Sequence, residues 1–154
     1  MSYFTPPANF AYHSPYVIRC AVPVHTSEVA FLHEKMGVRK FYLINAPLTT
    51  VLRESGMARK LTYSQWNITS IHAGSAQLDS YERLLGEIVA ERELGSNICL
   101  LGTPDDVALV CAGLRRLEGW SLAMSIRELC TIMDADVPSN DALCMLDEFD
   151  KHSS

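Results

Sequence analysis

Residues 96–120 read SNICLLGTPDDVALVCAGLRRLEGW, and the fold of the chain is decided there. The apolar run at 97–101 predicts a buried central strand, the residues after it a tight loop, and the apolar spacing over 105–118 a helix. In a strand-loop-helix unit the free backbone N–H groups and the positive end of the helix dipole converge on the loop. A phosphate is therefore the usual ligand of such a loop.

The residues that open the helix predict that its N–H donors are satisfied within the chain. Thr103 is expected to be the N-cap residue and Pro104 to take the first helical position. Asp105 and Asp106 then place two carboxylates in the first turn. A phosphate at this loop would meet like charge, so the pattern argues against a phosphate site.

Outward from this stretch, predicted strands alternate with predicted helices. Further strands are expected at 16–19, 40–44 and 67–71. Further helices are expected at 26–36 before Gly37, at 49–55 before Gly56, and at 79–92, 121–133 and 139–149. This order predicts an α/β fold, in which helices flank a central, mostly parallel sheet and the C-terminal part is helical.

The composition is that of one globular domain covering residues 1–154, with 1–8 and 152–154 as expected loose ends. The net charge of −5 argues against a nucleic-acid surface, which needs clustered Lys and Arg. No apolar run is long enough for a membrane span, and the N-terminal residues lack the pattern of a secretory signal. Five cysteines without a CxxC pair indicate reduced thiols, so a cytoplasmic location is expected.

Several weak matches, in a fixed order over about 9–150, resemble the plant and fungal atypical dual-specificity phosphatases, a branch of the cysteine-dependent tyrosine phosphatase superfamily. The run CAGLRRLEGWSLAMSIREL (111–129) is similar to the helix pair that follows the active-site loop of that family. Residues 14–44 are similar to its opening strand, helix and second strand, and Phe149 with Asp150 to its ending. The resemblance implies a cysteine-phosphatase-like fold without a cofactor. For an active member it implies hydrolysis of inositol pyrophosphates or of phosphotyrosine.

The sequence departs from this family at the catalytic loop, which in the family is a Cys, five residues and an Arg. Counting back from Gly119 and Trp120 without a gap places Leu100 at the nucleophile position and Asp106 at the arginine position. A shift by one residue gives Cys99 and Asp105 instead. The reaction needs a thiolate and a guanidinium that grips the phosphoryl oxygens, and both registers lack the guanidinium. No catalytic residue is expected in this degenerate loop, which comprises Cys99, Leu100, Leu101, Gly102, Thr103, Pro104, Asp105 and Asp106.

Other candidate residues each have a structural interpretation beside the functional one. Cys99 is either a small core residue or a displaced nucleophile coupled to His72. Asp79 is either a relic general acid or, with Glu82, a capping box at the start of a helix.

The remaining candidates point to no cofactor or metal. Arg115 and Arg116 either bind an acidic ligand or complement the helix dipole. The histidines have no metal-ligand spacing, so no metal site is expected.

Three functions follow from these observations. The first is a non-catalytic pseudophosphatase, similar to the fungal Oca proteins, that binds protein partners, with related phosphatase-like proteins as the expected class. The second is a phosphatase that uses Cys99 in a non-standard site. The third is a sensor for a cationic or neutral ligand. Neither a nucleic acid nor a membrane is an expected partner. Residues 58–66 have no counterpart in the family and are interpreted as an added surface.

Overall fold

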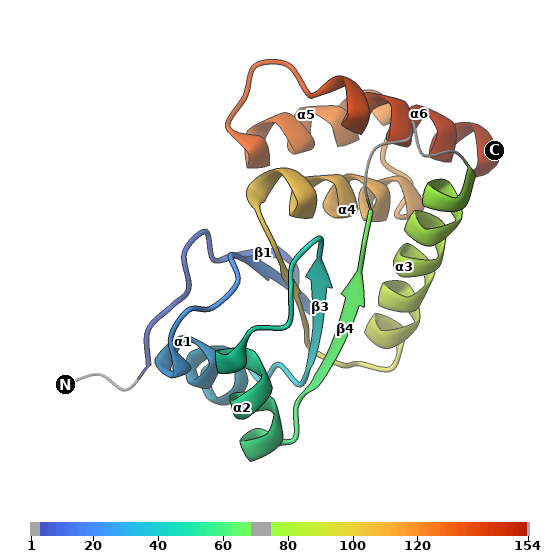
Figure 1. The fold of residues 1–154 in the computed structure, drawn as a ribbon. Coiled ribbons are helices and arrows are strands. Elements are labelled where there is room, and N and C mark those ends of the chain that lie inside the picture. Colours follow the sequence, from blue (N-terminus) through green and yellow to red (C-terminus); the bar gives the residue numbers. More distant parts are fainter. Residues whose placement is uncertain (1–3, 69–74, 154) are drawn as a thin grey trace.

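The computed structural model describes residues 4–68 and 75–153, and its centre is a five-stranded sheet with helices on both faces (Figure 1). The strands lie in the order β1-β2-β5-β3-β4. The strand bounds are β1 Ala11–Ser14, β2 Val17–Cys20, β3 Lys40–Ile44, β4 Thr62–Trp66 and β5 Ile98–Leu101. Strand β1 is antiparallel to β2, and all other neighbours are parallel. The predicted α/β fold with a mostly parallel sheet is confirmed.

The helices form two layers and a C-terminal stack. Helix α1 (Thr26–Ala30), the π-helical turn η1 (Phe31–Lys35) and α2 (Thr50–Arg59) lie on one side of the sheet (Figure 1). Helices α3 (Ser75–Glu93) and α4 (Pro104–Leu117) cover the other side. Helices α5 (Leu122–Met133) and α6 (Asn140–Ser153) pack on α4 and form the predicted helical C-terminal part.

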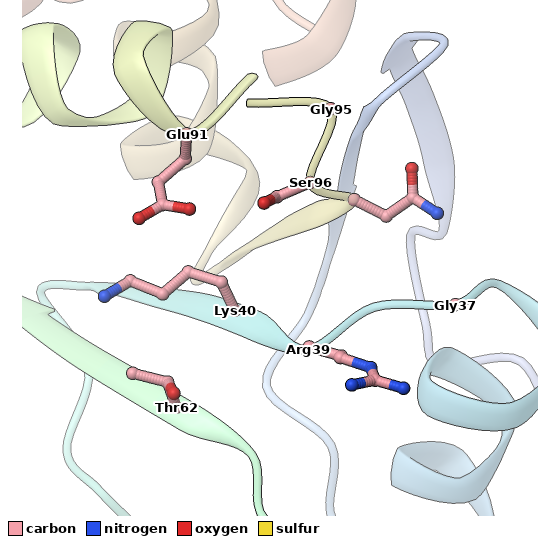
Figure 2. Close-up of a pocket in the computed structure, with 8 residues that line it drawn as sticks. Gly37, Arg39, Lys40, Thr62, Glu91, Gly95 and Ser96 are labelled. Carbon is pink, nitrogen blue, oxygen red and sulfur yellow. The ribbon is translucent and has the colours of Figure 1, made fainter. Parts of the chain in front are cut away.

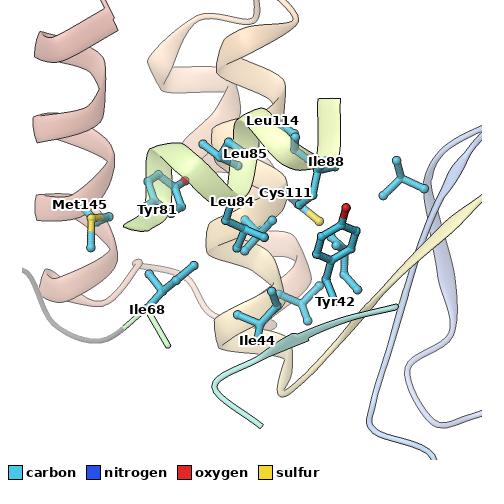
Figure 3. Close-up of a cluster of buried hydrophobic side chains, with 14 of the residues drawn as sticks. Tyr42, Ile44, Ile68, Tyr81, Leu84, Leu85, Ile88, Cys111, Leu114 and Met145 are labelled. Atoms are coloured by element: carbon cyan, nitrogen blue, oxygen red, sulfur yellow. The ribbon is translucent and has the colours of Figure 1, made fainter. Parts of the chain in front are cut away.

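Strand β5 lies at the middle of the sheet and is buried on both faces. Ile98 and Leu100 belong to the cluster under α3 and α4, whereas Cys99 and Leu101 belong to the cluster under α1 and α2. A parallel strand covered on both faces reads as an unbroken apolar run, and this is why β5 was predictable. Figure 3 shows the first cluster, in which Tyr42 and Ile44 of β3 face the apolar side chains of α3 and α4.

Two strands differ from the prediction. The strand expected at 67–71 is wrong: β4 occupies Thr62–Trp66, Asn67 and Ile68 follow it, and 69–71 lie outside the described residues. Strand β4 is at the edge of the sheet and carries Thr, Ser and Gln, so it lacks the apolar run of a central strand. Residues 58–66 form the end of α2 and an edge strand of the sheet, and their interpretation as an added surface stays a prediction. Strand β1 was not predicted.

Gly56 does not end helix α2 as predicted. The helix continues to Arg59 and ends where Lys60 adopts the left-handed conformation, with φ of 57°. A Cβ at Gly56 would lie 2.5 Å from the Tyr63 ring. Gly56 is needed because α2 approaches β4 closely there. The helix ends at Lys60 instead.

We predict opposite effects for alanine at two helical glycines. A Cβ at Gly113 of α4 would lie 2.7 Å from Leu85 Cδ1 and also clash with the Tyr81 hydroxyl, so Gly113→Ala is expected to lower the free energy of unfolding by about 1–3 kcal/mol. Gly86 of α3 has open space around it, so Gly86→Ala is expected to raise that free energy by up to about 1 kcal/mol. Urea unfolding of both variants tests this, and equal effects at the two sites would contradict the packing.

Candidate functional site

The turn between β5 and α4 occupies the place where the sequence predicts a degenerate catalytic loop. Strand β5 ends at Leu101 and α4 begins at Pro104, so only Gly102 and Thr103 connect them. The Gly102 N–H donates to the Cys20 carbonyl over 3.2 Å. The predicted cap is confirmed, because Thr103 is the N-cap residue and its hydroxyl accepts from the Asp106 N–H over 3.3 Å. The N–H groups of Gly102, Asp106 and Val107 are thus already bonded within the chain, since the Val107 N–H donates to the Thr103 carbonyl over 3.0 Å, and they are not available to a phosphate.

The Asp106 carboxylate is held on both oxygens within the chain. Its Oδ2 accepts from the Thr103 hydroxyl and its Oδ1 from Asn45 Nδ2, each over 2.9 Å. Asn45 also donates from Nδ2 to the Ile68 carbonyl over 2.7 Å and accepts from the Ile68 N–H over 2.6 Å. The residue at the expected arginine position therefore ties α4 to the segments that follow β3 and β4.

Very little space remains on the β2 side of this turn. The hollow between the β5–α4 turn and β2 has a volume of about 10 Å³ and is lined by Arg19, Cys20, Gly102, Pro104 and other residues. A cavity needs at least about 10–15 Å³ to hold one water molecule. A phosphate, which is several times larger than water, does not fit there.

Neither candidate for the nucleophile position lies at the surface. The Cys99 side chain is buried, and its Sγ is 3.5 Å from Cys20 Sγ on the neighbouring strand. Burial raises the pKa of the Cys99 thiol well above its ordinary value, and the Cys20 thiol beside it adds to this effect. Leu100 is buried on the opposite face of the sheet. His72, the proposed partner of Cys99, lies outside the described residues.

The structural interpretation of Asp79 is wrong. Helix α3 begins at Ser75, so Asp79 is inside the helix and cannot form a capping box with Glu82. The Asp79 side chain is exposed on α3. A relic acid role for Asp79 stays a prediction. Asp79 is not among the residues that line the cavity bordering the β5–α4 turn.

That cavity lies at the carboxyl edge of the sheet and has a volume of about 320 Å³. The acidic residues Asp105, Asp106 and Asp141 line it together with apolar residues such as Leu109 and Met145. Such a lining repels anions. A cationic or neutral group is the chemistry that it can accept.

The arginines that carry the family resemblance have partners within the chain. Arg115 donates to Glu128 Oε2 over 3.0 Å, to Glu118 Oε2 over 2.9 Å and to the His13 carbonyl over 2.6 Å. Arg116 donates to the Asp150 carboxylate and to the Trp120 carbonyl. These bonds join α4 to β1, α5 and α6. Arg115 and Arg116 thus hold the frame of the fold, and their donors point to residues of this chain rather than to an acidic ligand.

His13 of β1 is buried within the same network. Its ring lies 3.8 Å from Glu118 Oε1 and 3.7 Å from Glu128 Oε1, with the Arg115 guanidinium close by. Burial, followed by the charge of Arg115, lowers the pKa of His13 from 6.5 to about 4. His13 is therefore neutral at pH 7.

A larger pocket lies at the opposite edge of the sheet, where β3 and β4 begin, and sequence reasoning did not find it. Its volume is about 460 Å³, and its lining includes Arg39, Lys40, Glu91 and Ser96. Figure 2 shows Glu91 of α3 above Lys40, with Arg39 to the right of Lys40. The lining comes from four separate segments, so no single motif marks it. None of the predicted site residues belongs to this pocket.

The structure also bears on metal binding and on membranes. Among residues 4–68 and 75–153, no three His, Cys, Asp or Glu side chains are grouped so that they could hold a metal ion. None of the described helices combines the length and the apolarity that a transmembrane segment requires.

Comparison with known proteins gives matches in structure only. No model of a known family matches the sequence, and no curated protein matches it. The core catalytic domain of the PP-IP phosphatase SIW14 from S. cerevisiae, solved with citrate, superposes with a TM-score of 0.70 at 17% identity, over 97% of this chain and 93% of that chain. PTPMT1 in complex with PI(5)P superposes with a TM-score of 0.70 at 14% identity, over 93% of this chain and 95% of that chain.

Kinase-associated phosphatase, with its catalytic cysteine replaced by serine, gives a TM-score of 0.74 at 14% identity, over 96% of this chain and 97% of that chain. The chain therefore has the fold of the cysteine-dependent phosphatases. At this level of identity the likeness concerns the fold.

The burial of Cys99 predicts a large difference between thiols. Cys144 is exposed, whereas Cys99 and Cys20 are buried. A buried thiol reacts only when the protein opens, so alkylation of Cys99 at pH 8 is expected to be at least about 1,000-fold slower than that of Cys144. Peptide mapping after timed treatment with iodoacetamide measures both rates. Labelling of Cys99 as fast as Cys144 would contradict its placement.

The neutral, buried His13 predicts a pH dependence of stability. Because its folded pKa of about 4 is below its ordinary 6.5, the unfolded chain binds the extra proton between these values. The stability is complete above pH 6.5 and falls as the pH drops towards 4, by up to about 1.4 kcal/mol per pH unit. Urea unfolding at several pH values between 4.5 and 7 should show that the free energy of unfolding changes less with pH in His13→Gln than in the wild type. In the control variant, His25→Gln at an exposed position, the free energy of unfolding should change with pH as it does in the wild type.

Proposed function

We propose that this chain is a pseudophosphatase, an Oca-like and catalytically degenerate relative of the plant and fungal atypical dual-specificity phosphatases, that acts as a protein-interaction or regulatory subunit. The observation that carries the proposal is the two-residue turn between β5 and α4, closed by Asp106. Cysteine-dependent dephosphorylation begins with a thiolate that attacks phosphorus while a cationic loop stabilises the phosphoryl oxygens. Each of these requirements fails at this turn for a separate physical reason.

The attacking group fails because of burial. The Cys99 thiol is buried under α1 and α2 beside the Cys20 thiol, and its raised pKa keeps it protonated. The loop fails because of charge, since the Asp106 carboxylate stands at the expected arginine position. The hollow on the β2 side of the turn is too small for a phosphate, with a volume of about 10 Å³, and the 320 Å³ cavity on the other side is lined by Asp105, Asp106 and Asp141. Loss of a single well-placed donor already costs about 10²- to 10³-fold in rate.

An active phosphatase for phosphotyrosine or inositol pyrophosphate is the alternative. It would have to move Cys99 out of the central strand, which breaks the pairing of β5 with β2 and β3. A sensor without turnover is a further alternative, and the 320 Å³ cavity lined by Asp105, Asp106 and Asp141 favours a cationic or neutral ligand for it.

The interaction role follows from a fold that is kept while the catalytic groups are lost. The ion pairs of Arg115 and Arg116 hold α4 against α5 and α6 and so maintain the packing of the phosphatase-like fold. A frame without a reactive loop can still contribute its surface. We propose related phosphatase-like proteins as partners and the cytoplasm as the location.

Turnover measurements test this proposal. The purified chain is assayed on p-nitrophenyl phosphate and on an inositol pyrophosphate, beside Cys99→Ser and a Leu100→Cys, Asp106→Arg double variant. We expect no turnover from any of the three, because the two substitutions neither lengthen the turn nor open space on its β2 side. An active phosphatase in parallel reactions shows that the substrates are sound. Turnover by the wild type that disappears in Cys99→Ser would overturn the proposal.

A further inference from the structure

Strand β4 forms one edge of the sheet, and its outer side is available for pairing. Within the described residues its only strand neighbour is β3. The side chains of Thr62 and Gln65 are exposed, and those of Tyr63, Ser64 and Trp66 are partly buried. The strand therefore reaches the surface along its whole length.

The pairing with β3 determines which backbone groups point outward. The Thr62 N–H donates to the Arg39 carbonyl over 2.9 Å, and the Trp66 carbonyl accepts from the Asn45 N–H over 2.8 Å. Backbone groups alternate along a strand with a period of two. Thr62, Ser64 and Trp66 therefore pair with β3, whereas the N–H and C=O groups of Tyr63 and Gln65 point away from the sheet.

Within the described residues, β4 carries none of the charges, prolines or bulges that protect many sheet edges from pairing. Proteins usually block an edge strand with Lys, Pro, an inward charge or a bulge. Residues 62–66, TYSQW, contain neither a charge nor a proline, and their register with β3 is unbroken. The other edge is different, since β1 has a register irregularity between Tyr12 and Ser14. Strand β4 is thus the edge on which another strand can be added.

We propose that β4 pairs antiparallel with β4 of a second copy of this chain, about a two-fold axis at Ser64. In this register Tyr63 of each copy lies opposite Gln65 of the other, so the four outward groups of each strand meet partners. An isologous contact requires this reciprocity. Ser64 lies opposite Ser64 and Thr62 opposite Trp66, so no like charges oppose one another.

Strand β4 would be the contact surface of the proposed interaction subunit, and in that respect this proposal rests on the proposed function. The two can fail separately, since dimerisation is measured without a substrate. A dimer with turnover would contradict only the pseudophosphatase, and an inert monomer only the paired edge. The strands are short, with five residues each, so the contact belongs to the weak, concentration-dependent class.

Disulfide trapping tests the register directly. Residues opposite each other in a non-hydrogen-bonded antiparallel pair have Cα atoms about 4.5 Å apart, which suits a disulfide. In a Cys144→Ser background, Ser64→Cys is therefore expected to give a covalent dimer under oxidised glutathione. The matched Gln65→Cys variant is expected to stay monomeric, because the two positions 65 would be about 8–9 Å apart. Equal trapping of both variants, or of neither, would overturn the proposal.

Sedimentation of the untrapped protein provides the second test. We expect the wild type to dimerise as its concentration rises, and either of two substitutions to raise the dissociation constant at least about tenfold. Gln65→Pro removes an outward N–H that the sheet does not use. Ser64→Asp places like charges across the axis but keeps an acceptor for Trp66 Nε1, which donates to the Ser64 hydroxyl. Tyr12→Asp on β1 is the control and should dimerise like the wild type. A wild type that stays monomeric at millimolar concentration would overturn the proposal.

Discussion

The Asp106 carboxylate is the group on which the carboxyl edge of the sheet depends. It accepts hydrogen bonds from Thr103 at the start of α4 and from Asn45 after β3, and Asn45 in turn is bonded to Ile68 after β4. Three segments that are distant in sequence are thus joined at the edge where parallel α/β sheets bind their ligands. The Asp106 carboxylate therefore both orders this edge through its hydrogen bonds and adds negative charge to it.

The likeness to phosphatases that the structural comparison shows is a likeness of fold. Arg115 and Arg116 belong to the stretch that resembles the phosphatase family, and their partners Glu118, Glu128 and Asp150 belong to the packing of α4, α5 and α6. Such a network can be retained for structural reasons while the loop before it changes. The fold of a cysteine-dependent phosphatase is therefore compatible with a central strand whose Cys99 and Leu100 are both core residues.

The sequence predicted those elements whose signals are local. Strand β5 is an apolar run, and the cap of α4 follows from Thr103, Pro104 and the first-turn carboxylates. Strand β4 was misplaced because an edge strand with exposed Thr62 and Gln65 lacks an apolar signal, and Gly56 was misread because its close contact with Tyr63 is tertiary. The hydrogen bond from Asn45 to Asp106 joins residues 61 positions apart in the sequence, so this contact at the β5–α4 turn could not be predicted from motif spacing.

We expect that the β5–α4 turn does not accept a phosphate. Amide resonances of Gly102, Thr103, Asp105 and Asp106 in ¹⁵N-labelled protein, followed while inorganic phosphate is added at constant pH and ionic strength, test it most directly. We expect no saturable shift of these four resonances up to about 10 mM phosphate, which would nearly saturate a site with a dissociation constant of about 1 mM. Saturable shifts confined to these amides would contradict this expectation and reopen the turn as a phosphate site.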